Sequence, residues 1–78
     1  MNAKRRNKLA QIALQLDGLR TQLESLRDEE QEAFDNLPDN IKDTDRGEAA
    51  AEACEALDNA VSALEDTTDT LSTLAEGA

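Results

Sequence analysis

Residues 37–46 read LPDNIKDTDR and lie between two long stretches of helical periodicity. Pro38 disfavours helical geometry at Leu37, so a helix that arrives from the N-terminal side ends there. Polar residues make up most of the remaining segment, and Ile41 is placed to cover the end of a core. We predict a connection over residues 37–46, with one short helical turn after Pro38. The same features argue against a single continuous parallel coiled coil.

The stretch before the connection carries a regular apolar seam. Its large apolar residues alternate at spacings of three and four, which is the a/d pattern of a coiled-coil helix. The pattern continues through Glu30 and Ala33 to Leu37, and it predicts a helix over residues 3–36. Gly18 lies inside this helix and costs about 1 kcal/mol relative to alanine. The seam residues are Leu9, Ile12, Leu16, Leu19, Leu23 and Leu26.

The stretch after the connection carries a second seam and predicts a helix over residues 47–75. Thr44 or Asp45 is suited to cap its start, and Asp45 with Glu48 three residues later resembles a capping box. Gly47 falls in the first turn, where a glycine costs less than in the middle of a helix. The seam residues are Ala50, Cys54, Leu57, Val61, Leu64, Thr68, Leu71 and Ala75.

Alanine-rich positions flank the second seam on one side and make the apolar face of this helix wider than one partner helix needs. A chain of 78 residues also buries little surface by itself, so self-association is expected. We therefore predict an all-α fold, in which residues 1–78 form one antiparallel two-helix hairpin that dimerises into a four-helix bundle. The residues expected at the interface between copies are Ala49, Ala53, Ala56, Ala60, Leu64 and Leu74.

Charge is unevenly distributed along the chain. The 18 acidic and 8 basic side chains give a net charge of -10, with residues 1–27 at +4 and residues 28–78 at -14. An antiparallel hairpin lays the basic start of the first helix beside the acidic end of the second, and we expect these ends to pair. The acidity argues against nucleic acid as a direct ligand, because phosphate binding needs clustered Lys and Arg.

The densest acidic run extends from the end of the first helix, through the connection, into the second helix. In a hairpin these carboxylates crowd one end, and carboxylates along a rod can be spaced like DNA phosphates. We predict that this surface binds a basic surface of a host protein and inhibits or modulates it, with DNA mimicry as one mode. A merely solubilising surface is the plainer interpretation, and self-assembly through the apolar helix faces is the alternative function. The predicted partner-binding residues are Asp28, Glu29, Glu30, Glu32, Asp35, Asp39, Asp43, Asp45, Glu48, Glu52, Glu55 and Asp58.

Several classes of function are disfavoured by composition. The chain has no His and a single cysteine, Cys54, so an intrachain disulfide and a cysteine-based zinc site are excluded. A calcium loop that starts at Asp43 would place Glu48 where glycine is required and Cys54 where a bidentate Glu belongs. We predict no enzymatic activity, no cofactor and no metal. No apolar run approaches the roughly 18 residues of a membrane span, so we expect a cytoplasmic protein.

Two runs carry a resemblance to known proteins. Residues 29–38 read EEQEAFDNLP and residues 45–49 read DRGEA. With the basic start and the Glu/Ala/Leu-rich second helix, these runs resemble a group of small acidic helical proteins of bacteriophages and prophages. Asp45 stands where that group has Glu. The resemblance covers about two-thirds of the chain and implies a phage-type accessory protein acting in a bacterial host cell. It implies no particular activity. More loosely, the chain is similar in charge and shape to phage-encoded inhibitors that are helical dimers and mimic DNA.

Overall fold

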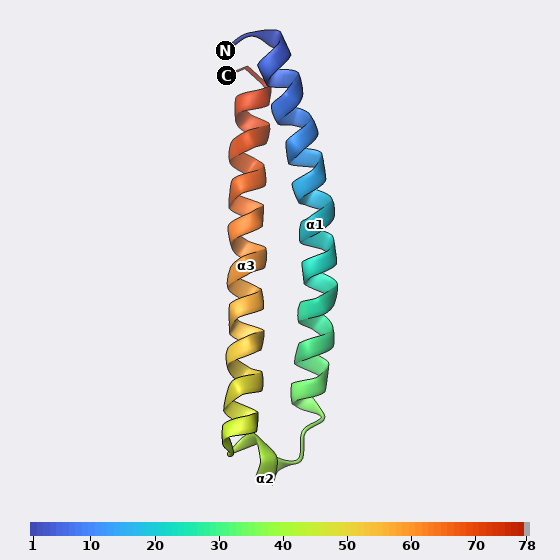
Figure 1. Ribbon diagram of the computed structural model, residues 1–78, viewed down its shortest axis with the longest axis vertical. Helices are drawn as coiled ribbons and strands as arrows, with labels where there is room; N and C mark the ends of the chain where they lie inside the picture. Colours follow the sequence, from blue (N-terminus) through green and yellow to red (C-terminus); the bar gives the residue numbers. More distant parts are fainter. Residues whose placement is uncertain (78) are drawn as a thin grey trace.

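The chain folds into a helical hairpin, as predicted. The computed structural model describes residues 1–77 and contains α1 (Ala3–Asp35), α2 (Asp39–Lys42) and α3 (Asp45–Ala75). The two long helices run antiparallel side by side, α2 lies at the turn, and both chain ends lie at the opposite end (Figure 1). The Cα atoms extend over 58 × 14 × 13 Å, so the molecule is a rod.

The ends of α1 follow from local chemistry. The side chain of Asn2 caps the start by accepting a hydrogen bond from the Arg5 N–H, at 2.8 Å. At the other end the helix finishes at Asp35, and the Leu37 N–H donates to the Phe34 carbonyl in a tighter turn, at 3.0 Å. Pro38 follows directly. The predicted termination of the helix by this proline is therefore confirmed.

The connection contains the short helical turn that Pro38 predicted, but the predicted capping box is absent. Thr44 precedes α3, and its hydroxyl donates to the Ile41 carbonyl, so it makes no cap to the first N–H groups of α3. Asp45 is already the first residue of the helix, where its charge favours the positive end of the helix dipole. The threonine is drawn backward because the turn leaves the Ile41 carbonyl within its reach.

The predicted seam of α3 is confirmed, because all of its residues are buried or half-buried along α1. Cys54 is 6 % exposed and Val61 is 3 % exposed, which makes them the centre of the packing. With Ala13 at 5 %, they are the buried hydrophobic side chains of the core. All three are small or medium in size. The hairpin by itself therefore encloses a thin core.

The predicted seam of α1 is only half right. Leu9, Leu16 and Leu23 are half-buried, but three other seam residues point outward. Their exposed fractions are 44 % for Ile12, 50 % for Leu19 and 53 % for Leu26. A different row takes their place on the side of α3, at positions one residue further along the helix. That row consists of Ala13, Arg20, Arg27 and Phe34.

Two rotations of α1 were compatible with its sequence, because both seams share Leu9, Leu16 and Leu23. The chosen rotation puts the small Ala13 against α3, where it permits close approach of the helices. It also lets Arg20 and Arg27 reach carboxylates of α3 at 3.8 and 3.5 Å. The consequence is an apolar row of α1 that α3 does not cover.

Gly47 allows the start of α3 to lie very close to the backbone of Lys42 in the turn. It is buried, and a Cβ atom built on it would lie 2.5 Å from the carbonyl carbon and the Cα of Lys42, and closer still to the Lys42 oxygen. The ammonium of Lys42 in turn lies 5.4 Å from the centre of the Phe34 ring, a cation–π contact. Gly47 is therefore required by packing, beyond the low cost of glycine in a first helical turn that the sequence suggested.

Candidate functional site

The predicted partner-binding carboxylates gather at the turn, as the hairpin topology requires. We call this group the acidic end; its members lie between Asp28 and Asp58, on the last part of α1, the connection and the first part of α3. All but one of the twelve are exposed. Glu30 is half-buried and lies on the row of α1 that faces α3. Glu30 is therefore a poorer contact residue than its neighbours Glu29 and Glu32.

Few cations neutralise the acidic end. Among residues 1–77, its ion pairs within 4.0 Å are those of Arg27 with Asp28 at 3.2 Å and with Asp58 at 3.5 Å. Hydrogen bonding to Asp28, together with the charges of the nearby carboxylates, raises the pKa of Arg27. Ten of the twelve carboxylates are left without an ion pair in the part of the chain that the structure describes. They are available to an external partner.

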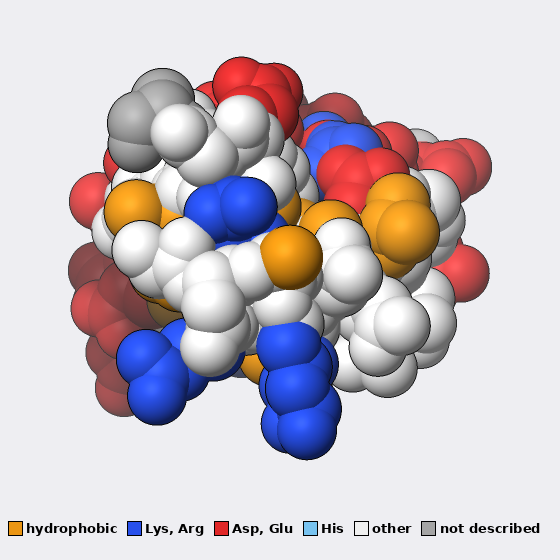
Figure 2. Space-filling model, turned by 90° about the horizontal axis from the view of Figure 1, so that it is seen from above, with side chains coloured by type: hydrophobic (Ala, Val, Ile, Leu, Met, Phe, Trp, Pro, Cys, Tyr) orange, Lys and Arg blue, Asp and Glu red, His pale blue; other side chains and the backbone are white. Residues whose placement is uncertain are grey.

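The net charge belongs to one half of the rod. Residues 1–19 and 66–77 make up the half with the chain ends and carry four basic and four acidic side chains. Residues 20–65 make up the half with the turn and carry four basic and fourteen acidic side chains. Viewed from the chain ends, Lys and Arg side chains project from the near end (Figure 2). The terminal half is thus neutral, and the turn half holds the whole charge of -10.

The predicted pairing at the terminal end does not form. Among residues 1–77, Lys4, Arg5, Arg6 and Lys8 make no ion pair with α3, and the Arg6 guanidinium instead donates to the Met1 carbonyl. The pairs between helices lie further along the rod, where Arg20 reaches Glu65 and Arg27 reaches Asp58. Lys4, Arg5 and Lys8 are exposed, and the half-buried Arg6 lies beside Gly77, just past the end of α3, without pairing with a carboxylate there.

The ion pairs mark one flank of the hairpin, and an apolar stripe marks the opposite one. Arg20 also contacts Asp17 and Glu24, and hydrogen bonding to Asp17 is the largest cause of its raised pKa. Asp17 and Glu24 of α1 and Glu65 of α3 occupy heptad positions beside the seam. In an antiparallel pair of helices these positions lie on the same flank. The positions on the other flank are apolar except for the exposed Thr67. We define the apolar stripe as Ile12, Leu19 and Leu26 of α1 with Ala53, Ala60 and Leu74 of α3.

The structure gives different places to the residues predicted at the interface between copies. Ala53, Ala60 and Leu64 are half-buried, and Leu64 is used within the hairpin. Ala49, Ala56 and the 43 % exposed Leu74 remain accessible. The sequence had assigned the leucines of α1 wholly to the hairpin, so their part in this surface was missed. The regular spacing of seven residues between Ile12, Leu19 and Leu26 was the available signal.

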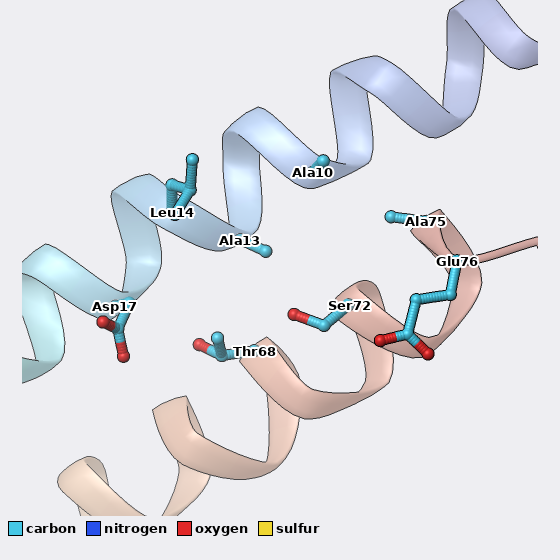
Figure 3. Close-up of a pocket in the computed structure, with 8 residues that line it drawn as sticks. All are labelled: Ala10, Ala13, Leu14, Asp17, Thr68, Ser72, Ala75 and Glu76. Atoms are coloured by element: carbon cyan, nitrogen blue, oxygen red, sulfur yellow. The ribbon is translucent and has the colours of Figure 1, made fainter.

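An open groove lies between the helices near the chain ends. Its volume is about 500 Å³. Thr68 and Ser72 point from α3 toward α1, and Leu14 points away from α3 (Figure 3). The Thr68 hydroxyl oxygen is buried without a hydrogen-bond partner among the described residues. The lining residues are Ala10, Ala13, Leu14, Asp17, Thr68, Ser72, Ala75 and Glu76.

Cys54 is protected by its burial. Burial raises the pKa of its thiol above the usual value of 9.0, and the charges of Glu30 and Asp35 add to the effect. At a pH just above 9, the thiol is therefore still protonated in the folded protein, whereas it has begun to ionise in the unfolded chain. Because the folded-state pKa is the higher one, the associated stability is fully present below about pH 9 and is lost as the pH rises through the folded pKa.

This protection predicts the reactivity of Cys54. Alkylation by iodoacetamide is expected to be slower in the native protein than in urea, and to need a higher pH. The unfolding temperature is also expected to fall as the pH rises above about 9. The chain has no Tyr, which keeps this window clear of phenol titration. A Cys54→Ala variant should lose this part of the pH dependence. Equal alkylation rates in the folded and unfolded protein would contradict a buried thiol.

Comparisons with known proteins add no family. No protein-family model, curated protein or solved structure matches this chain. Neither a metal cluster nor a membrane-spanning helix is found among the described residues 1–77. No group of three or more His, Cys, Asp or Glu side chains converges there as a metal site would require. None of the helices there is both long enough and apolar enough to cross a bilayer. The geometry offers the acidic end, the apolar stripe and the groove near the chain ends as candidate binding surfaces.

Proposed function

We propose that the protein is an acidic binding protein that inhibits or modulates a host protein by docking its acidic end on a basic surface. The observation that carries this proposal is the concentration, at one end of the rod, of ten carboxylates that make no ion pair within residues 1–77. Such a surface steers a cationic partner toward it and adds specificity by charge complementarity. A solubilising role alone would not require this uneven distribution of charge.

We infer that mimicry of DNA is the mode of binding. The turn half has a net charge of -10 over about half of the 58 Å rod, or about one net negative charge per 3 Å. Double-stranded DNA carries about one negative charge per 1.7 Å of its axis. The two densities agree within about a factor of two, which supports the occupation of a nucleic-acid-binding groove by the acidic end. A phage-type protein that does this inside a bacterial cell would act on a nucleic-acid-binding protein of the host.

The test removes charge from the acidic end without changing side-chain size. A Glu29→Gln, Glu32→Gln and Glu52→Gln variant is expected to retain about tenfold less of the partner in an affinity capture from bacterial lysate, because exposed charges contribute roughly 0.5 kcal/mol each. All three residues are exposed, so the fold should be unaffected. Retention by the unmodified protein should fall steeply with salt and should be competed by duplex DNA.

A matched control removes the same charge from the terminal half. An Asp66→Asn, Asp69→Asn and Glu76→Gln variant has the same net charge as the test variant but keeps the acidic end, and it should bind like the unmodified protein. If both variants lose binding equally, general charge is responsible and the proposed site is wrong. If duplex DNA does not compete, the mimicry is wrong.

A second proposal concerns self-association. We propose that two hairpins form a four-helix bundle, because within residues 1–77 the buried hydrophobic side chains of one hairpin are only Ala13, Cys54 and Val61. Large apolar side chains remain exposed instead, among them the leucines of the apolar stripe. A hairpin of 78 residues with so thin a core gains most by covering them with a second copy. This is the alternative function through apolar faces, and it is compatible with the acidic end.

A further inference from the structure

The apolar stripe runs along the middle of the rod on the flank away from the ion pairs. The pairs of Arg20 with Glu65 and of Arg27 with Asp58 fix the register of the two helices. In that register Ile12 lies level with Leu74, and Leu26 lies level with Ala60. From Ile12 to Leu26 the stripe extends about 21 Å along α1 at 1.5 Å per residue. Both helices contribute to it, and on α3 the exposed Thr67, level with Leu19, separates Ala60 from Leu74.

Charge restricts which occupant this face can accept. A second copy that packed parallel would set two turn halves beside each other, each with fourteen acidic and four basic side chains. A copy that packed antiparallel would set each turn half beside a neutral terminal half. The exposed basic residues Lys4, Arg5 and Lys8 would then lie near the acidic turn of the other copy. Like charges repel over distances within the Debye length, so the antiparallel arrangement is favoured.

We propose that the apolar stripe is the interface with a second copy of this chain, packed antiparallel about a two-fold axis perpendicular to the rod. This inference rests on the proposed self-association and identifies its face and orientation. A two-fold axis makes the interface self-complementary, so the leucines of one copy pack on those of the other. The interface thus draws most of its large side chains from α1, whereas the sequence placed it wholly on α3, on four alanines with Leu64 and Leu74. Burial of exposed leucines is the stronger driving force, because they remove more apolar area from water.

The first experiment measures mass by sedimentation equilibrium. The unmodified protein is expected to be a dimer at micromolar concentration. Leu19→Lys and Leu26→Lys variants should shift to monomer, with an at least tenfold higher dissociation constant. Leu14→Lys is the matched control, because Leu14 is 75 % exposed and lies outside the stripe, and it should remain dimeric. A monomeric unmodified protein would overturn both this inference and the proposed self-association, and would leave the face to a different protein.

The second experiment determines how the two copies are oriented relative to each other. It leaves the stripe unaltered, so it still applies if a stripe variant fails to fold. Spin labels are attached to cysteines at Asn7 or Asn40 in a Cys54→Ala background, and distances between copies are measured by electron paramagnetic resonance. Asn40 lies in α2 at the turn, and Asn7 lies near the chain ends. Copies labelled at Asn40 should show a separation approaching the 58 Å length of the rod, and copies labelled at Asn7 should lie about 36 Å apart along it, at 1.5 Å per residue on either side of Leu19.

Mixing the two labelled proteins should give a short distance between Asn7 of one copy and Asn40 of the other. Short distances between identical sites would show a parallel dimer and overturn the orientation, while self-association would stand. A dimer that survives both Leu19→Lys and Leu26→Lys would overturn the face in the same way. An oligomer larger than a dimer would also contradict the inference, because a two-fold interface closes at two copies.

Discussion

Replacing Gly47 by alanine is expected to destabilise the protein by about 2–3 kcal/mol, the cost of forcing extra atoms into a closely packed site. The new Cβ would lie 2.5 Å from the carbonyl carbon and Cα of Lys42. These are backbone atoms of α2, and they cannot rotate away as a side chain can. Either α2 detaches or the first turn of α3 unwinds. Urea unfolding followed by circular dichroism measures the loss.

Gly18→Ala is the matched control for this prediction. A Cβ at Gly18 has no neighbour within 4 Å, so the substitution should stabilise α1 by about 1 kcal/mol through helix propensity. The two glycines lie in helices and receive the same added methyl group. Opposite changes in the free energy of unfolding would therefore isolate the effect of the tight turn. If Gly47→Ala also stabilised the protein, the close approach of α2 to α3 would be wrong.

Val61→Asp is expected to unfold most of the molecules at room temperature. Val61 is 3 % exposed and lies on the row of α3 that packs along α1. An uncompensated charge buried there costs about 3–5 kcal/mol, which a thin core cannot absorb. The helical signal in circular dichroism should fall sharply in this variant. A low pH that protonates the new carboxyl should restore part of it.

Ser62→Asp provides the comparison, because it adds the same charge at the next residue, which is exposed. The expected change in stability is within about 0.5 kcal/mol, as for most surface substitutions. Equal stability of the two variants would mean that α1 does not cover Val61. In that case the hairpin packing, and with it the definition of the apolar stripe, would have to be abandoned.

The two proposed surfaces have a joint consequence for binding. The acidic end occupies the turn, and the apolar stripe occupies the middle of the rod. An antiparallel dimer would therefore present one acidic end at each end of the bundle. Such a dimer could engage two basic sites at once, and its apparent affinity would exceed that of one hairpin if the sites are suitably spaced. Stripe variants that are monomeric but folded would separate this contribution from the intrinsic affinity of one acidic end.

The sequence by itself determined most of the architecture. Pro38 and the polar residues after it end one helical pattern and begin another, because proline restricts the residue before it and removes a backbone donor. The seam of α3 was also determined, because its large apolar residues fit a single series of spacings of three and four. Cys54 and Val61, the centre of the packing, belong to that series. The gathering of carboxylates at the turn follows from these two facts, because an antiparallel hairpin brings the end of one helix beside the start of the next.

Only the tertiary structure decided how α1 is rotated about its axis. Leu9, Leu16 and Leu23 belong to two possible seams, and periodicity on one helix cannot choose between them. The choice depends on α3, which accepts Ala13 at close range and offers carboxylates to Arg20 and Arg27. The role of Gly47 was hidden for the same reason: its neighbour, Lys42, is placed by the path of the turn. Contacts between elements depend on shape and distance, and these are set when the helices pack.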